Sequence, residues 1–319
     1  MKEYEYFLKA NPDIRKMMNN DVSLKNIASL EQIKNLNLYY LRCPQLFLDT
    51  DIDYNLYSFD ISNFMKLLLC MVVNGKLSYT FHYENCRCTK KEVEDLMSIV
   101  KQAFEICHSR FIEYFSGIYA VEVQTKMLGY NNIITEIDLM ISFTEHYHGA
   151  LEDTFKLLKI CDFIKSELVR NNKITRNMTQ YQIARILFNW VVLHTSYDTN
   201  LRRYSFTGYS AVAYGYAVCQ GFTALYNALC KCFGINIVGM SGDGLNKVRG
   251  AWENHIWSFA LLDNRNTYID VTWGCPQFKD EGTLKKYSIS PEYLCDFSYF
   301  DISYKDLMKE HRWDKNVYG

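Results

Sequence analysis

The chain has no excess of charge of either sign, and this narrows the range of its partners. Its 35 lysine and arginine residues nearly balance 36 aspartate and glutamate residues, which leaves a net charge of −1 and a pI of about 6.7. It has no basic run of the kind that neutralises a phosphate backbone. Nucleic acid is therefore not expected as a partner, and the 15% aromatic content is expected to pack cores and line grooves.

Segments that direct a chain to a membrane are also lacking. Residues 1–6 have neither the charged stretch nor the apolar stretch of a secretory signal. The longest apolar run, from Phe64 to Val73 around Lys66, is far shorter than the about 20 residues that span a bilayer. A cytoplasmic protein without membrane contacts is expected.

The cysteines follow neither a disulfide framework nor a structural zinc pattern. There are 11 of them, an odd number, scattered over 319 residues. Tight C-x₂-C pairs are missing, which leaves only weak candidates for metal ligands. These are His82, Cys86, Cys88, His146 and His148. Reduced thiols are expected, with no metal and no cofactor, and the oligomeric state stays open.

What the chain does carry is a cysteine at the start of a predicted amphipathic helix. Residues 217–225 are Ala-Val-Cys-Gln-Gly-Phe-Thr-Ala-Leu, and apolar residues recur at helical spacing as far as Phe233. Gly234 stands where a glycine would end such a helix. Cys219 would then lie in the first turn, where unpaired N–H groups and the helix dipole favour a thiolate.

A histidine and an aspartate follow on a predicted β-hairpin. Three strands are predicted, over residues 235–240, 252–262 and 267–273. A turn at 263–266 joins the last two, with His255 on one and Asp270 on the other. A turn centred in the middle of that segment would place His255 opposite about residue 274, which leaves Asp270 a few residues off, a difference that one bulge or a longer loop would absorb. Trp257 shares the face of His255 and could shield the contact from water.

Together these residue types can perform acyl transfer. Cys219 can attack a carbonyl or carboxamide carbon, His255 can take and return a proton, and Asp270 can hold the imidazole tautomer. The backbone N–H of Cys219 is the simplest oxyanion donor. No second donor is evident, and Tyr214 and Trp190 are the candidates.

Each feature also has an ordinary structural interpretation. A lone cysteine in a helix is usually a small buried hydrophobe, and Cys, His and Asp occur together in most chains. Tyr197 and Asp198 can form either a helix terminus or a wall of the site. Residues 242–244, Gly-Asp-Gly, are too short to cradle a phosphate and are expected to form a flexible loop at the rim of the site.

The first half of the chain is less regular. Short helices are expected in residues 1–60. Longer helices are predicted over residues 62–73, from Thr89, over 151–169 and from Thr179, with strands at 77–83 and 119–123. A charged stretch at 170–173 is expected to separate an N-terminal α+β region, residues 1–170, from a second domain, residues 171–319.

Three blocks resemble the signature blocks of the transglutaminase-like superfamily, and more narrowly its bacterial branch of predicted cysteine peptidases. Residues 214–222 are Tyr-Gly-Tyr-Ala-Val-Cys-Gln-Gly-Phe, residues 254–257 are Asn-His-Ile-Trp, and residues 268–273 are Tyr-Ile-Asp-Val-Thr-Trp. The likeness covers roughly residues 175–315. It implies an α+β, papain-like fold with the nucleophile at a helix N-terminus packed on an antiparallel sheet.

The resemblance also implies a function. Members act through a covalent thioester, and they cleave peptide bonds, crosslink glutamine to lysine, deamidate or remove glycans from asparagine, while some are inactive. By resemblance the catalytic residues are Cys219, His255 and Asp270. Candidates for contacts with substrate or oxyanion are Tyr214, Gln220, Trp257, Trp190 and Tyr197. We expect a thiol-dependent enzyme that acts on a polypeptide, more often by hydrolysis than by crosslinking. The alternative is a catalytically silent binding or scaffold protein.

Overall fold

The computed structural model describes residues 64–65, 67–68, 71–72, 78–87, 89–116, 118–128, 133–143, 150–202, 205–247, 249–275 and 295–313. Predictions for residues 1–60 lie outside this set. In the predicted helix at 62–73, the described residues are helical. None of the helices in the described part is long and apolar enough to cross a bilayer.

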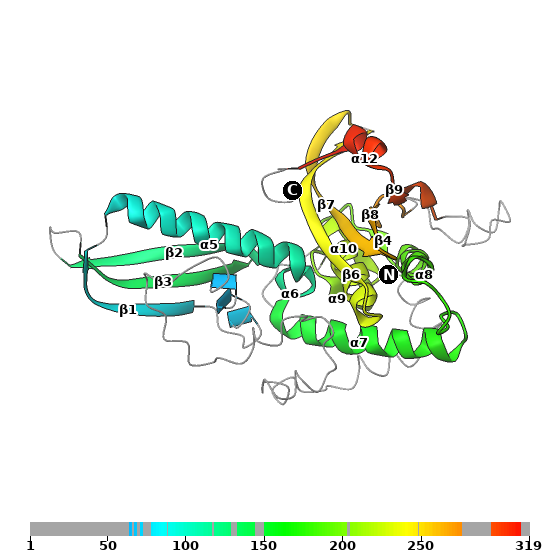
Figure 1. Ribbon diagram of the computed structural model, residues 1–319, viewed down its shortest axis with the longest axis horizontal. Coiled ribbons are helices and arrows are strands. Elements are labelled where there is room, and N and C mark those ends of the chain that lie inside the picture. The colour runs from blue at the N-terminus through cyan, green and yellow to red at the C-terminus, as the bar shows by residue number, and fades with distance from the viewer. Residues whose placement is uncertain are drawn as a thin grey trace.

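A three-stranded antiparallel sheet and one long helix form the N-terminal part (Figure 1). The strands, in sheet order, are β1 (Ser78–Arg87), β3 (Ile133–Phe143) and β2 (Ile118–Leu128). Helix α5 (Lys90–Arg110) runs alongside them and is followed by the short α6 (Ile112–Phe115). The predicted capping box at Thr89 is confirmed, since Thr89 and Glu92 exchange hydrogen bonds. The sequence did not predict strand β3.

Two predicted helices follow the first sheet in the chain and precede the second sheet. They are α7 (Ala150–Arg170) and α8 (Gln180–His194). Thr179 forms the predicted capping box at the start of α8. The Asp263 carboxylate, from a distant hairpin turn, also accepts the first two N–H groups of α8 at 3.0 and 3.2 Å. Donors that a helix cannot satisfy itself are thus paired through a tertiary contact.

The second half of the chain forms a five-stranded antiparallel sheet with helices packed on it (Figure 1). In sheet order the strands are β10 (His311–Arg312), β6 (Asn236–Asn246), β7 (Ala251–Leu262), β8 (Arg265–Ile269) and β9 (Phe300–Ile302). The three central strands were predicted. The two outer strands come from the C-terminal segment and were not.

Short elements complete this half. They are the parallel pair β4 (Ser196–Tyr197) and β5 (Tyr216–Ala217), helix α9 (Gly208–Ala213), helix α10 (Cys219–Cys232), the 3₁₀ helix η6 (Phe297–Tyr299) and helix α12 (Tyr304–Glu310). Helix α10 is buried along most of its length against β6 and β7 on one side and α7, α8 and α9 on the others. Helix and antiparallel sheet therefore mix as the predicted α+β class requires.

The β7–β8 hairpin corrects one prediction. Its turn contains only Asp263 and Asn264, with φ of 49° and 64°, which is a type I′ turn. This turn is earlier than predicted and moves the register by two residues. Extending the observed pairing places Asp270, one residue past β8, diagonal to His255. The contact therefore needs neither the bulge nor the longer loop that the sequence prediction allowed for.

One hydrophobic core joins the two halves of the described chain. Its largest cluster takes side chains from α5, α6 and α7 as well as from α8, α10 and the second sheet. Lys231 of α10 also reaches Glu113 of α6, with Nζ 2.7 and 2.8 Å from the two carboxylate oxygens, and both side chains are buried. The division between residues 170 and 171 stays a prediction.

Candidate active site

Helix α10 begins at Cys219, as predicted. The residue before it, Val218, makes no capping hydrogen bond with its side chain, so no N-cap side chain occupies the N–H groups of the first turn. Gly221 lies against the preceding loop, where a Cβ atom would be 2.8 Å from the carbonyl oxygens of Ser205 and Thr207. The glycine after the cysteine therefore lets that loop pack against the start of the helix.

Cys219 differs from the other described cysteines in exposure. Seven cysteines have described side chains, none of these seven forms a disulfide, and all of them except Cys219 are buried. The other thiols are Cys107, Cys161, Cys230, Cys232, Cys275 and Cys295. Burial raises the pKa of Cys107 and of Cys230 above the usual range, which keeps these thiols protonated. Among these seven thiols, Cys219 is therefore the accessible one.

A polar stripe holds α10 against the strand that carries His255. Cys219, Thr223 and Asn227 are four residues apart and share one face of the helix. The Thr223 hydroxyl donates to the backbone oxygen of Ile256 at 3.2 Å, and the Asn227 oxygen accepts from the Ser258 hydroxyl at 2.7 Å. The face of α10 that carries the thiol is thus fastened to β7.

His255 and Asp270 form a buried pair. His255 Nε2 lies 2.7 Å from Asp270 Oδ2. The other oxygen, Oδ1, accepts the backbone N–H groups of Thr272 and Trp273, each at 3.0 Å, so the carboxylate is held from both ends. This leaves Nδ1 of His255 for Cys219, which lies close enough to contribute to the raised pKa of the imidazole.

The charges of this pair follow from its surroundings. Burial by itself would lower the pKa of His255, but the Asp270 carboxylate and Cys219 outweigh it and raise the pKa to about 10. Burial would raise the pKa of Asp270, whereas His255 and then His311 lower it well below its usual range. The pair is therefore imidazolium and carboxylate at neutral pH.

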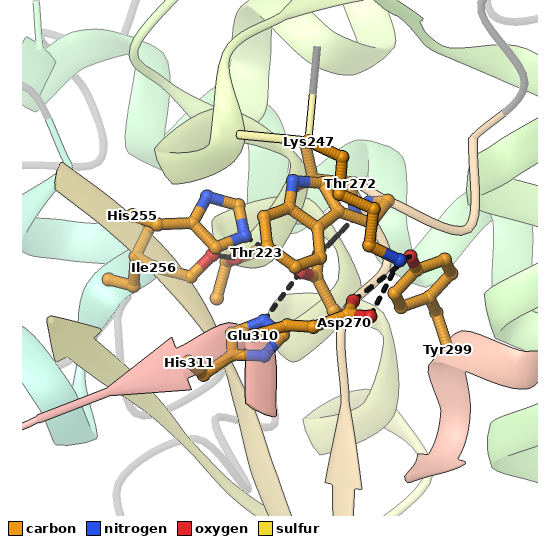
Figure 2. A network of polar contacts seen from close by, with 10 residues as sticks. Thr223, Lys247, His255, Ile256, Asp270, Thr272, Tyr299, Glu310 and His311 are labelled. Carbon is orange, nitrogen blue, oxygen red and sulfur yellow. Dashed lines mark hydrogen bonds and ion pairs between the residues drawn. The ribbon is translucent and has the colours of Figure 1, made fainter. Parts of the chain in front are cut away.

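A second histidine contacts the same carboxylate, and the sequence prediction did not single it out. His311, the first residue of β10, has its Nε2 3.0 Å from Asp270 Oδ2 and is 1% exposed. Figure 2 shows His311 reaching Asp270 from the C-terminal strand, while His255 belongs to a different strand. Asp270 therefore lies between two imidazoles that are far apart in the sequence.

The Gly-Asp-Gly segment makes room for this arrangement. Residues 242–244 lie inside β6, paired with both β7 and β10, so the predicted flexible loop is wrong. A Cβ atom at Gly242 would be 2.2 Å from the backbone oxygen of Arg312, and one at Gly244 would be 2.8 Å from the Trp273 ring. The two glycines therefore allow β10 and the Trp273 ring to approach, and they are the sequence signal that could have indicated a strand beside them.

Tryptophans enclose the two imidazoles. The His255 ring stacks on Trp273 with centroids 4.7 Å apart and an interplanar angle of 15°. Trp257 lies 6.1 Å from His255 and 4.7 Å from His311, and it is 0% exposed. This burial suits the shielding expected of Trp257 and leaves its ring no surface for contact with a substrate.

Tyr197 and Gln220 lie beside the thiol. Tyr197 is 44% exposed, and its pKa is raised to about 12 by partial burial and then by Cys219, which places the phenol near the sulfur. Gln220 Nε2 lies 3.0 Å from Nε2 of His108 on α5. Burial lowers the pKa of His108 to about 4, so a neutral imidazole of the N-terminal part contacts the residue next to Cys219.

Each of the two candidate oxyanion donors packs against another aromatic ring. Tyr214 ends α9, is 37% exposed and packs edge-on against Tyr209. Trp190 lies on α8 and stacks on His194, with centroids 4.1 Å apart. A role for either side chain as an oxyanion donor stays a prediction.

The His255, Asp270 and His311 group also offers a donor set for a metal. One ligand atom from each residue lies within 4.8 Å of the others, and two imidazoles with a carboxylate can hold a divalent cation. Hydrogen bonds of 2.7 and 3.0 Å already account for both contacts with the carboxylate. Of the weak candidates from the sequence, His82 and Cys86 lie on β1, and Cys88, His146 and His148 lie outside the described residues.

A partly exposed thiol thus lies at a helix N-terminus that packs on an antiparallel sheet, with His255 on one strand and Asp270 directly after another, an arrangement of the papain-like fold class. The family model described as transglutaminase-like superfamily matches residues 169–272. This match confirms the resemblance of the three sequence blocks to that superfamily and agrees with the α+β fold class.

Two solved structures are similar over part of the chain. A candidate cysteine protease from Cytophaga hutchinsonii is 13% identical, with a TM-score of 0.30, over 49% of this chain and 63% of the other. A TGase is 12% identical, with a TM-score of 0.32, over 70% of this chain and 57% of the other. The chain thus spans less than two thirds of either structure. No curated protein matches the sequence.

Proposed function

We propose that this protein is a thiol-dependent acyl-transfer enzyme that acts on peptide or carboxamide bonds of a polypeptide. The observation that carries the proposal is the partly exposed Cys219 beside an imidazole that Asp270 holds at 2.7 Å. A structural cysteine needs neither exposure nor an oriented histidine. The superfamily match over residues 169–272 supports the same chemistry.

The geometry supports a two-stage reaction. The Cys219 sulfur attacks the carbonyl carbon, and the thiol proton resides on Nδ1 of His255. The backbone N–H of Cys219 donates to the developing oxyanion, because the first turn of α10 has no N-cap side chain to compete for it. The tetrahedral species then collapses to a thioester, and the leaving amine departs with the proton from His255.

The second stage regenerates the thiol. His255 removes a proton from water as the water oxygen attacks the thioester carbon. Collapse releases a carboxylic acid, and the proton returns to the sulfur. Asp270 contributes throughout by keeping Nε2 of His255 protonated and the ring oriented. We place water ahead of an amine as the acceptor because the three sequence blocks resemble the peptidase-like branch.

Alkylation of the thiol tests the proposal. Iodoacetamide at pH 6 is expected to label Cys219 well before any other cysteine, as measured by mass spectrometry of the digested protein. Cys232→Ala is the matched control, because this thiol is buried on the same helix and its loss should leave labelling of Cys219 unchanged. Equal, slow labelling of all cysteines would contradict the proposal and favour the scaffold alternative.

Product analysis then distinguishes the reaction types. Incubation with denatured protein, and with glutamine peptides plus a labelled amine, is expected to release peptides or ammonia and to incorporate little amine. Every product must disappear in Cys219→Ala. Amine incorporation as the main reaction would replace hydrolysis by crosslinking while leaving the roles of Cys219, His255 and Asp270 in place.

A further inference from the structure

We propose that His311 is a positioning residue for this site, so that the C-terminal strand β10 completes the acyl-transfer machinery. The inference rests on the proposed function. Its basis is the contact between His311 Nε2 and the carboxylate oxygen that also receives His255, at 3.0 and 2.7 Å.

The contact completes the hydrogen bonding of Asp270. An ionised carboxylate has about four acceptor positions. Oδ1 takes two backbone N–H groups, and Oδ2 takes the N–H groups of His255 and His311. Without His311, one side of Oδ2 has no donor among the described residues, and only the two bonds to Oδ1 hold the carboxylate independently of His255. His311 therefore fixes the atom that orients the base.

The strand that carries His311 is held by contacts of its own. His311 and Arg312 pair with Gly244 and Asp243 of β6. Arg312 Nε also lies 2.9 Å from the Asp243 carboxylate. Before the strand, Glu310 pairs with Lys247 at 2.6 Å and accepts from the hydroxyl of Tyr299, a cluster that Figure 2 shows beside Asp270. These contacts hold β10 in place without the His311 side chain, and they therefore position its imidazole next to Asp270.

The chemistry of the ring also indicates more than filling of space. His311 is 1% exposed, and its Nδ1 is a buried atom without a hydrogen-bond partner among the described residues. An apolar side chain at this place would bury no unpaired atom. The hydrogen bond between Nε2 and Asp270 offsets the cost of the unpaired Nδ1, and an apolar side chain could not form it.

Replacement of the donor tests the role. A hydrogen bond to a charged group corresponds to a change of about 10- to 100-fold. His311→Phe is expected to reduce kcat and the alkylation rate of Cys219 at pH 6 by this factor, with KM changed less than about threefold. His311→Gln carries an N–H at the position of Nε2 and is expected to restore most of the rate. Equal rates in wild type and His311→Phe would overturn the proposal.

Leu307→Ala separates orientation from packing. Leu307 is buried on α12 in the cluster that includes Trp257 and has no polar group to offer Asp270. We expect this variant to lower the melting temperature while Cys219 keeps its alkylation rate. If it lowers the rate as much as His311→Phe at a similar loss of stability, the role of His311 is structural and the proposal fails.

A measurement on the unaltered protein guards against a variant that does not fold. With ¹⁵N-labelled histidine, two low-field Nε2–H proton resonances are expected, one for each imidazole on Asp270, and His311→Gln should remove one of them. A single resonance in the wild type would overturn the assignment. A wild-type Cys219 no more reactive than the other thiols would instead overturn the proposed function, and this role with it.

Discussion

Replacing Asp270 by asparagine should change the direction of the hydrogen bonds around His255, in addition to removing a charge. Two backbone N–H groups at 3.0 Å require an acceptor at the Oδ1 position, so the amide oxygen is expected to remain there. The amide NH₂ then occupies the position of Oδ2 and donates to both imidazoles. His255 must accept through Nε2 and carry its proton on Nδ1, which leaves Cys219 facing a donor where it needs a base.

The size of the effect follows from the pKa of His255. A pKa of about 10 instead of 6.5 corresponds to about 5 kcal/mol in favour of the protonated ring. Burial opposes this shift, so without the Asp270 charge the pKa of His255 is expected to fall to 6.5 or below. A wrong tautomer and an uncharged ring together should reduce kcat by about 10²- to 10⁴-fold.

The pH dependence of folding gives a second readout of the same pair. A raised pKa means that His255 contributes its full stabilisation below pH 6.5 and loses it as the pH rises towards about 10. The lowered pKa of Asp270 means that its contribution is full above pH 3.8 and is lost at more acid pH. Wild-type stability should therefore decline between pH 7 and 10, and Asp270→Asn should lack most of that decline.

The assay combines alkylation of Cys219 from pH 5 to 10 with urea denaturation over the same range. Asp301→Asn is the matched control, since it makes the same change on β9, where the carboxylate binds Arg265 at 2.7 Å. The control should follow the wild-type profiles. If Asp270→Asn also follows them, the carboxylate does not govern the imidazole and the reasoning is refuted.

Three further outcomes are expected. Glu113→Ala leaves Lys231 buried without its carboxylate and should cost about 3–5 kcal/mol in urea denaturation, much of it recovered when Lys231→Met is added. Gly242→Ala places a Cβ atom 2.2 Å from the backbone oxygen of Arg312, so amide exchange in β10 should rise and Cys219 alkylation should slow. Treatment with EDTA should leave alkylation unchanged, because hydrogen bonds account for the His–Asp–His contacts.

Each of these outcomes has a control. Lys231→Met alone should also be destabilising, because it leaves the buried Glu113 carboxylate without its ammonium, whereas the double variant leaves neither charge. Gly239→Ala on the same strand has its closest contacts at 3.4 Å and should leave exchange in β10 unchanged. A rise in alkylation after EDTA, with metal found in the untreated protein, would show that the His–Asp–His group binds a cation.

Local patterns predicted the parts of the site that local physics controls. The helical spacing after Cys219 and the glycine at residue 234, with φ of 74°, were sufficient for α10 and its end. The capping boxes at Thr89 and Thr179 opened the helices that the structure contains. The hydrogen bonds of these capping boxes span three residues, so the sequence window contains both partners, whereas the contact of Asp263 with the start of α8 lies outside it.

Register and distant pairing were predicted less well. The sequence prediction places the hairpin turn too late, because it does not anticipate the positive φ values of Asp263 and Asn264. When the centre of a turn moves by one residue, the residue opposite each strand position changes by two. Residues 242–244 were taken for a loop because glycines are common in loops. The glycines are needed because β10 and the Trp273 ring approach this strand closely, and both are far from residues 242–244 in the sequence.

By itself the sequence determined the elements that carry Cys219 and His255, since amphipathic spacing, caps and strand alternation are properties of neighbouring residues. It extended the next strand too far, because β8 ends at Ile269 and Asp270 follows it. Only the tertiary structure decided that Cys219 alone among the described thiols is accessible, and that His311 shares the carboxylate with His255. Burial and contacts across 41 residues of chain depend on how whole elements pack, and packing energy is summed over the complete core.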